Sequence, residues 1–128
     1  MLVKTGVHIY KGAVVVVEES SGYVKPFVAG ASAGTANHFV GIAYEEADNT
    51  SGGNGDLSVR LFTQGDFGHA IASGVITDLG AKVYASADDT LVLTAAAGNN
   101  VFIGRAQDWV SGNEFVVRLH GIADADAV

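Results

Sequence analysis

Apolar residues in this chain occur in short runs, separated by stretches rich in glycine, serine, asparagine and aspartate. Runs of this length are typical of β-strands, whereas helices need longer segments with a period of 3.6 residues. The run at 12–19 contains four consecutive valines, whose branched side chains lose rotamer freedom in a helix. It predicts a strand that is buried on both faces or is covered by a neighbouring subunit.

The same pattern predicts further strands along the rest of the chain. Their ranges are 23–28, 38–44, 57–63, 65–71, 80–84, 90–94, 102–106 and 115–121. Pro26 places the strand at 23–28 on a sheet edge, because proline has no N–H to donate to a neighbouring strand. The long polar stretch at 45–56 is predicted to be the least ordered part of the domain interior.

One pattern occurs twice: an aromatic residue, a β-branched residue, glycine, any residue and alanine, then a polar loop, then Val-Arg-Leu and a later glycine. The first copy covers 39–43 and 57–65, and the second covers 102–106 and 115–121. Aligning the copies matches three pairs of residues: Gly12 with Gly80, Gly41 with Gly104, and Arg60 with Arg118. The first half is longer only in its loops, where a duplicated fold tolerates insertions.

These patterns predict an all-β protein, a compact glycine-rich β-barrel or sandwich with little helix. It would be built from two similar tandem halves at about 12–65 and 80–121. A chain of 128 residues favours a single domain. We expect residues 1–11 to form an N-terminal arm or edge strand, residues 12–121 to form the β domain, and residues 122–128 to form a flexible acidic tail.

Charge and composition narrow the classes of partner. The net charge is −7 and the seven Lys and Arg residues are scattered, so a nucleic-acid partner, which needs a basic patch, is not expected. The chain has no run of 18 apolar residues and no pattern of a signal peptide, so we expect no membrane span and synthesis in the cytoplasm. It has no cysteine, which excludes disulfides and thiolate metal sites.

No candidate catalytic or metal-binding group fits its motif. Asp48, Asn54 and Asp56 lie in one loop but lack the terminal glutamate and flanking helices of an EF-hand, so a solvated loop is expected. The histidines stand apart and do not form a zinc motif; they are His8, His38, His69 and His120. Asp66, His69 and Ser73 lack the strained turn of a hydrolase nucleophile. We therefore predict that the protein is not an enzyme and has no catalytic residue, cofactor or metal.

Three residues are candidates for contact with a partner. Arg60 and Arg118 are the repeated charges, and each is either a solvent-facing residue with its stem on the sheet or half of an ion pair across an interface. Trp109 lies just before the predicted turn at 110–113. Its side chain either folds back over one end of the barrel or anchors an interface.

Three pieces of sequence, taken in order, carry a resemblance. They are 39–43 with the acidic loop and 57–65; the connector 72–74 leading to 80–84 and 88–91; and 102–106 with 116–119. Together they span most of residues 12–121, and they resemble the small head decoration, or capsid cement, proteins of tailed bacteriophages. The resemblance implies a homotrimer on the outer capsid surface of the virion that bridges neighbouring major capsid protein subunits and stabilises the expanded head.

On this basis the contact surface is predicted to include Val3, Val7 and Ile9, together with one exposed hairpin and the residues Arg60, Trp109 and Arg118. An alternative is a small β-barrel that binds carbohydrate or serves as a phage tail or fibre module. Stacked aromatic residues on one exposed face would favour that alternative, with Tyr23, Tyr44, Tyr84 and Trp109 as the available material.

Overall fold

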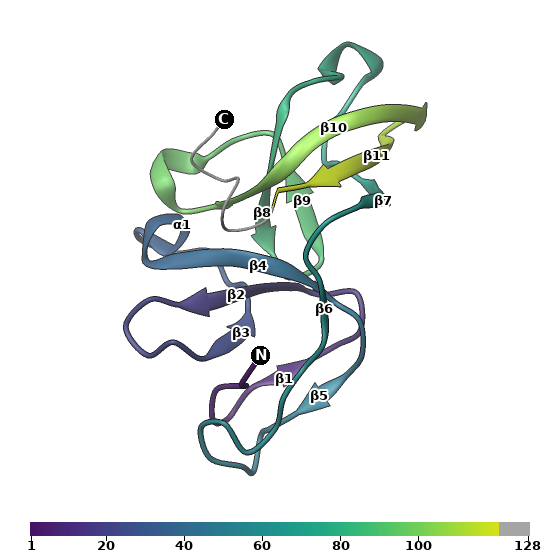
Figure 1. Cartoon of the computed structure of the whole chain (residues 1–128). Coiled ribbons are helices and arrows are strands. Elements are labelled where there is room, and N and C mark those ends of the chain that lie inside the picture. The colour runs from purple at the N-terminus through teal and green to yellow at the C-terminus, as the bar shows by residue number, and fades with distance from the viewer. Residues whose placement is uncertain (121–128) are drawn as a thin grey trace.

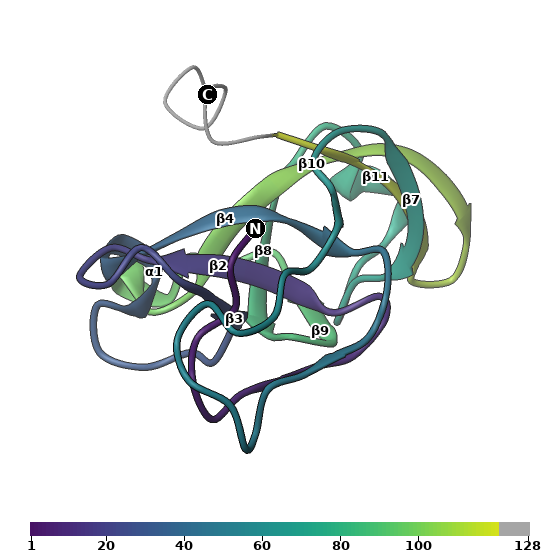
Figure 2. The same cartoon turned by 60° about the horizontal axis from the view of Figure 1, so that its bottom comes forward.

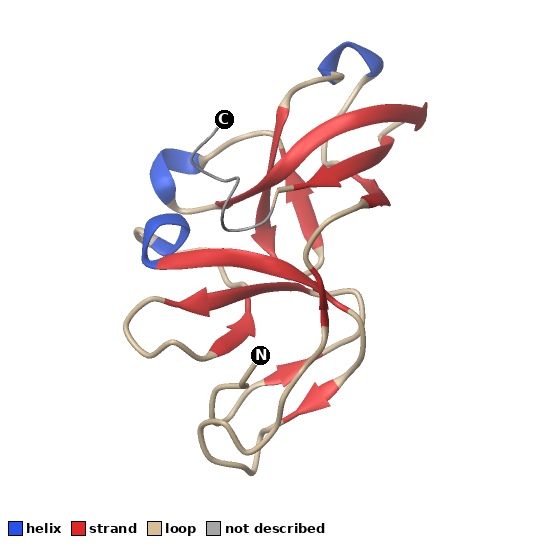
Figure 3. Cartoon of the chain, in the orientation of Figure 1, coloured by secondary structure: helices blue, strands red, loops and turns tan. Residues whose placement is uncertain are grey.

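The computed structural model describes residues 1–120, and within that range the protein is almost entirely β-structure (Figure 3). The predicted all-β class with little helix is confirmed. The strands form three antiparallel sheets. The expected acidic tail at 122–128 lies outside the described residues.

The four-stranded sheet has the order β3-β2-β4-β6. Its strands are β2 (Val14–Glu18), β3 (Val24–Pro26), β4 (Asn37–Ala43) and β6 (Leu61–Phe62). Pro26 lies opposite Val15 in the outer strand β3, as its missing N–H predicted. On the other side of the sheet, β6 is the outer strand and places Phe62 opposite Ile42.

The five-stranded sheet has the order β7-β11-β10-β8-β9. Its strands are β7 (Asp66–Ala70), β8 (Lys82–Ala87), β9 (Thr90–Val92), β10 (Val101–Ser111) and β11 (Glu114–Leu119). An isolated bridge between Ile71 and Leu91 joins the end of β7 to β9. This bridge brings the two outer strands together, so the sheet curls toward a barrel.

The two sheets repeat the same strand arrangement. In the first sheet the strand order is β3-β2-β4-β6, and in the second the corresponding strands have the order β9-β8-β10-β11. The second sheet has one additional strand, β7, next to β11. The β2–β4 ladder shifts register just before Gly41, and the β8–β10 ladder shifts just before Gly104. These correspondences support the interpretation of two tandem halves, which stays a prediction from the sequence.

Three layers result from this arrangement (Figure 1). The four-stranded sheet is the middle layer, with the five-stranded sheet on one side. On the other side lie residues 1–11 and the small sheet of β1 (His8–Ile9) and β5 (Ala47–Asp48). A middle sheet covered on both faces explains the unbroken valine run, because alternate side chains of a strand point to opposite layers.

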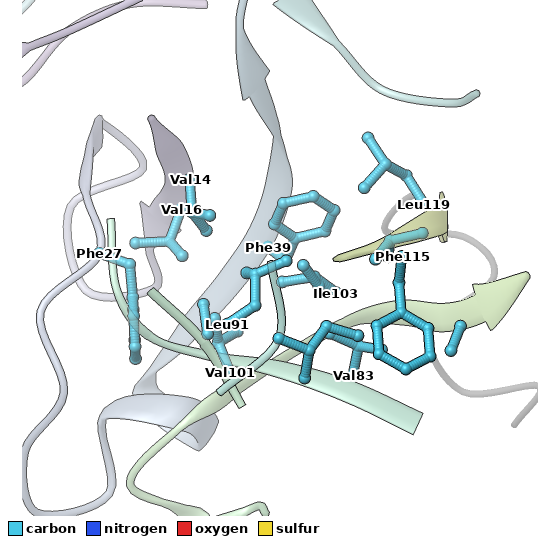
Figure 4. Packing of buried hydrophobic residues seen from close by; sticks show 14 of the residues in the cluster. Val14, Val16, Phe27, Phe39, Val83, Leu91, Val101, Ile103, Phe115 and Leu119 are labelled. Atoms are coloured by element: carbon cyan, nitrogen blue, oxygen red, sulfur yellow. The ribbon is translucent and has the colours of Figure 1, made fainter. Parts of the chain in front are cut away.

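The core is accordingly divided into two clusters. Val14 and Val16 of β2 point into the larger cluster, which joins the two main sheets around Phe39, Ile103 and Phe115 (Figure 4). Val15 points the other way, into a smaller cluster under the N-terminal segment. The prediction of a strand buried on both faces is therefore confirmed. The residues that pack on both faces belong to this chain.

Residues 1–11 belong to the smaller cluster and are not an extended arm. Val3 and Ile9 are fully buried there, and Val7 packs against it. The backbone N–H of Val3 donates to Leu57 O at 2.9 Å, and the N–H of Val59 donates to Met1 O at 2.9 Å. The segment is thus one side of the fold, with its own strand β1 at the edge.

The polar stretch at 45–56, predicted to be poorly ordered, is tied to that N-terminal segment. Asn49 is buried, and its Nδ2 donates to the backbone oxygens of Val3, Lys4 and Gly53 at 2.9–3.3 Å. Thr5 adds an Oγ1–H donated to Gly52 O at 2.6 Å. The prediction was wrong because a loop this polar can satisfy the backbone of a distant segment, which local composition does not reveal.

Among residues 1–120, helical structure is limited to single turns. They are α1 (Ala33–Ala36), η1 (Ile76–Asp78) and η2 (Ala96–Gly98). Gly34 of α1 lies so close to the segment before β10 that a Cβ there would stand 1.9 Å from Asn100 O. Within residues 1–120, no helix has the length and apolar character needed to cross a membrane.

Candidate contact surface around β6

Arg60, immediately before β6, is held by Glu45 at the surface of the protein. Its Nε donates to Glu45 Oε2 at 2.9 Å and its Nη2 to Oε1 at 3.2 Å, while its backbone N–H donates to Oε2 at 3.0 Å. The guanidinium also lies 4.6 Å from the centre of the Tyr44 ring, within reach of a cation–π interaction. The hydrogen bonds from Arg60 lower the pKa of Glu45.

Aromatic rings continue from this ion pair along the surface. The Tyr44 and Phe62 rings are 5.0 Å apart, and the Phe62 and Phe67 rings are 5.2 Å apart, both tilted. Tyr44 is 45% exposed and Phe62 is 39% exposed, whereas Phe67 is half-buried and packs on the larger core cluster. The row therefore runs from open surface into the core and is anchored at its inner end.

Met1 completes the surface. Its side chain is half exposed, and it lines a shallow hollow with Tyr44, Arg60 and Phe62. The terminal ammonium donates to Val59 O at 2.7 Å, which fixes Met1 beside β6. We call the surface formed by these four residues the β6 patch: Met1, Tyr44, Arg60 and Phe62.

The predicted contact residues do not form one surface. Val3 and Ile9 have no exposed side chain, so their predicted role in partner contact is wrong, because the fold uses them as core. Val7 is half-buried against the same cluster. Only Arg60 of the predicted set lies in the β6 patch.

Arg118, the second repeated arginine, pairs within the chain as Arg60 does. Its Nε donates to Asp66 Oδ1 at 2.8 Å and its Nη2 to Oδ2 at 3.1 Å, across the β7–β11 ladder. These hydrogen bonds lower the pKa of Asp66. Both arginines remain exposed to solvent, as the first alternative predicted. Each also forms an ion pair, as the second alternative predicted, but its acidic partner lies in the same chain.

Trp109 folds back at the tip of the β10–β11 hairpin. Its Nε1–H donates to Gly112 O at 3.0 Å, and its ring packs partly against the larger cluster. This is the first of the two predicted arrangements. Figures 1 and 2 both show the hairpin running to an end of the molecule away from β1 and the N-terminus.

Phe62 is an exposed residue of the β6 patch that the sequence analysis did not single out. It follows Leu61 directly, and alternation along a strand sends these two side chains to opposite faces. Because Leu61 packs on the smaller cluster, Phe62 faces outward. Two adjacent large apolar residues in an edge strand, Leu61 and Phe62, could have indicated that one of them is exposed.

The residues considered as metal ligands take part in separate local contacts within residues 1–120. Within residues 1–120, no group of three or more His, Asp or Glu side chains could hold a metal ion. In the loop considered for calcium, Asn54 Oδ1 accepts from the Thr5 N–H and Asp56 Oδ2 from the Gly53 N–H. His8 instead pairs with Glu46 at 2.6 Å and stacks on Tyr10.

The chain matches no known protein-family model, no curated protein and no solved structure.

Proposed function

We propose that the protein is a structural virion protein that binds the outer surface of an expanded phage head and bridges its major capsid subunits. We further propose that the β6 patch is the surface that docks on the capsid. The observation that carries this proposal is the exposed row of Tyr44 and Phe62 beside an arginine that is already neutralised by Glu45. The sequence resemblance supplies the class of partner.

The composition of the β6 patch suits a protein partner. Tyrosine, phenylalanine, methionine and arginine are enriched where protein interfaces are most deeply buried. Arg60 would be buried together with Glu45, so a partner would not have to cover an uncompensated charge. Tyr44 and Phe62 already contact each other and lose little side-chain freedom on binding.

A patch of this size predicts weak binding for a single copy. A stable interface buries about 800 Å² on each partner, more than four side chains provide. Many copies on one shell, or a trimer that engages several subunits at once, would raise the overall affinity by 10²–10⁴ through effective concentration. A contact worth only a few kcal/mol can therefore stabilise an entire head.

The direct test is co-sedimentation of the purified protein with expanded, decoration-free heads of its phage, with unexpanded proheads as the comparison. We expect saturable binding to expanded heads only, at a fixed ratio to the capsid subunit. Absence of binding to both particles would refute the proposal. Deletion of residues 1–9 is unsuitable as a probe, because it removes Val3 and Ile9 from the core.

The β6 patch is tested by the pair Tyr44→Ser and Phe62→Ser in one chain. Val110→Ser is the matched control, because Val110 is 60% exposed and lies at the far hairpin. We expect the double variant to lose head binding while both proteins keep their melting temperatures within a few degrees. Unchanged occupancy by the folded double variant would remove the β6 patch from the proposal.

A carbohydrate-binding module is the second candidate, because sugar rings also stack on exposed aromatic faces. Tyr44 and Phe62 are the exposed neighbouring rings that favour it. Tyr84 and Trp109 do not join them, since Tyr84 contacts Phe102 and Trp109 packs at the hairpin tip. A glycan screen in which wild type binds and the Tyr44 and Phe62 double variant does not would favour this candidate over capsid binding.

A further inference from the structure

A small apolar cavity lies between the two main sheets, near the start of β2. It has a volume of about 210 Å³ and is lined mostly by aliphatic side chains. Val14, Leu91, Ile103 and Leu119, all visible in Figure 4, form part of its wall. Apolar cavities of about this size stay dry and accept small apolar molecules such as benzene.

A polar hollow at the surface adjoins the cavity. The two share Gly12 and His69, and the hollow is also lined by Tyr10, Asp88 and Asp89. No atom lies within 4 Å of the position that a Cβ of Gly12 would occupy. The space beside Gly12 is therefore open. The backbone φ of 86° also favours glycine at this position.

The entrance is rich in hydrogen-bond acceptors. His69 Nδ1 lies 2.7 Å from Ala70 O, and because a carbonyl oxygen only accepts, Nδ1 is the donor in this hydrogen bond. Asp88 and Asp89 add two adjacent carboxylates, and neither has an ion-pair partner among the described residues. Burial, with a contribution from Asp89, raises the pKa of Asp88.

Lys11 is the cationic side chain that also lines the entrance. The residue is exposed, and its flexible stem lets the ammonium turn into water. The acidic groups at the entrance are the carboxylates of the β8–β9 turn, where Asp89 Oδ1 accepts from Thr90 Oγ1 at 3.0 Å.

We propose that this cavity and its entrance form a binding site for a small organic cation with one apolar end, such as an aromatic or branched aliphatic amine. The apolar end occupies the cavity between the sheets, and the ammonium group lies at the entrance beside the carboxylates of Asp88 and Asp89. The site shares no residue with the β6 patch and does not rest on the proposed capsid function, although Phe67 in its wall contacts Phe62.

Three aromatic probes that differ in the charge of their polar end separate the contributions: benzylamine, benzyl alcohol and phenylacetate. Their binding to the full chain is measured by titration with detection of NMR shifts at Val14, Val117 and His69. We expect benzylamine to bind about three- to fivefold more tightly than benzyl alcohol, as for an exposed ion pair. Phenylacetate is expected to bind most weakly, because its carboxylate would face two others.

Two variants test the two parts of the site. Asp88→Asn with Asp89→Asn should abolish the preference for benzylamine over benzyl alcohol and leave the affinity for the alcohol unchanged. Val14→Ile with Val117→Ile adds methylene groups to the cavity wall, so it should block all three probes without lowering the melting temperature. Val15→Ile is the matched control, because Val15 faces the smaller cluster on the other side of β2. This substitution should lower the melting temperature.

The proposal is overturned if no probe shifts the cavity-lining residues, or if all three probes bind wild type equally. It is also overturned if the folded Val14 and Val117 double variant binds benzylamine as wild type does. Should that variant fail to fold, the cavity is not free space, and this result equally contradicts the proposal.

Discussion

Gly104 and Arg118 approach each other so closely that a Cβ on Gly104 would stand 2.0 Å from the backbone oxygen of Arg118. The matching residue of the first half, Gly41, has the same constraint, with a Cβ position 2.4 Å from Phe62 O. Both glycines follow a register shift in their strands. The glycine of the repeated motif is therefore required because a neighbouring strand's carbonyl fills the space of its side chain.

Gly104→Ala is expected to destabilise the fold by about 3 kcal/mol, since β10 and β11 must separate to admit the methyl group. Chemical denaturation monitored by circular dichroism measures the change. Gly68→Ala is the matched control in the same sheet, because no atom lies within 4 Å of that Cβ position, and it should change stability by less than about 0.5 kcal/mol. Equal effects of the two substitutions would contradict the close approach.

Val15→Thr tests the middle layer. Val15 is fully buried on the face of β2 that points to the N-terminal segment, so the substitution places a hydroxyl of similar size in an apolar core. We expect a loss of about 1–3 kcal/mol in the free energy of unfolding. Val110→Thr, at an exposed position, should have almost no effect; a neutral Val15→Thr would mean that this face is open to water.

Asn49→Ala removes the amide that joins the loop to residues 3 and 4. Three backbone oxygens lose the Asn49 hydrogen bond, but Val3 O and Gly53 O still accept from the N–H groups of Gly55 and Asp56. We expect a loss of about 1–2 kcal/mol, together with faster proteolysis of the first eleven residues. Asn54→Ala is the comparison, since its exposed Oδ1 accepts only one bond, from Thr5. Slow proteolysis in both variants would show that Asn49 does not hold the N-terminal segment.

Glu18 provides the pH-dependent prediction. Hydrogen bonds from Lys4, Ser21 and Lys25 lower its pKa from 4.5 to about 2, with Lys4 Nζ at 2.7 Å and Lys25 Nζ at 3.2 Å. A carboxylate with a depressed pKa in the folded state stabilises the protein above pH 4.5, and this contribution is lost as the pH falls toward 2. Because these side chains keep part of their surface in water, we expect about 1 kcal/mol.

Glu18→Gln should therefore lower the free energy of unfolding at pH 7 by about 1 kcal/mol. It should also make the decline in stability between pH 4.5 and 2 less steep. Denaturation at a series of pH values measures both effects. Glu19→Gln is the control, because the neighbouring side chain is 66% exposed and its contact with His38 is 3.6 Å. An unchanged acid profile in Glu18→Gln would contradict the role of the ion pairs.

Local sequence predicted the strands because the information lies in neighbouring residues. Four valines disfavour a helix wherever they occur, and Pro26 weakens any interior strand, so β2 and the edge strand β3 followed from backbone preferences. The shared pattern around Gly41 and Gly104 likewise indicated two similar strand pairs. These properties do not depend on which distant residues come into contact.

The candidate site could be predicted only in part. The repeat identified Arg60 and Arg118 as distinctive, but their partners, Glu45 and Asp66, are chosen by strand pairing across 15 and 52 residues of sequence. Exposure of Phe62 depends on which face of β6 packs on the smaller cluster. Neither property is encoded in local composition.

The sequence by itself determined the all-β class, the main strands and the edge position of Pro26, because period-two alternation and backbone sterics act over a few residues. Only the tertiary structure decided that Val3 and Ile9 are core, that Asn49 joins two distant segments, and that Tyr44 and Phe62 meet on the surface. Burial is a property of the assembled layers. A short apolar segment has the same pattern whether it covers its own core or a partner, and only its actual neighbours distinguish the two.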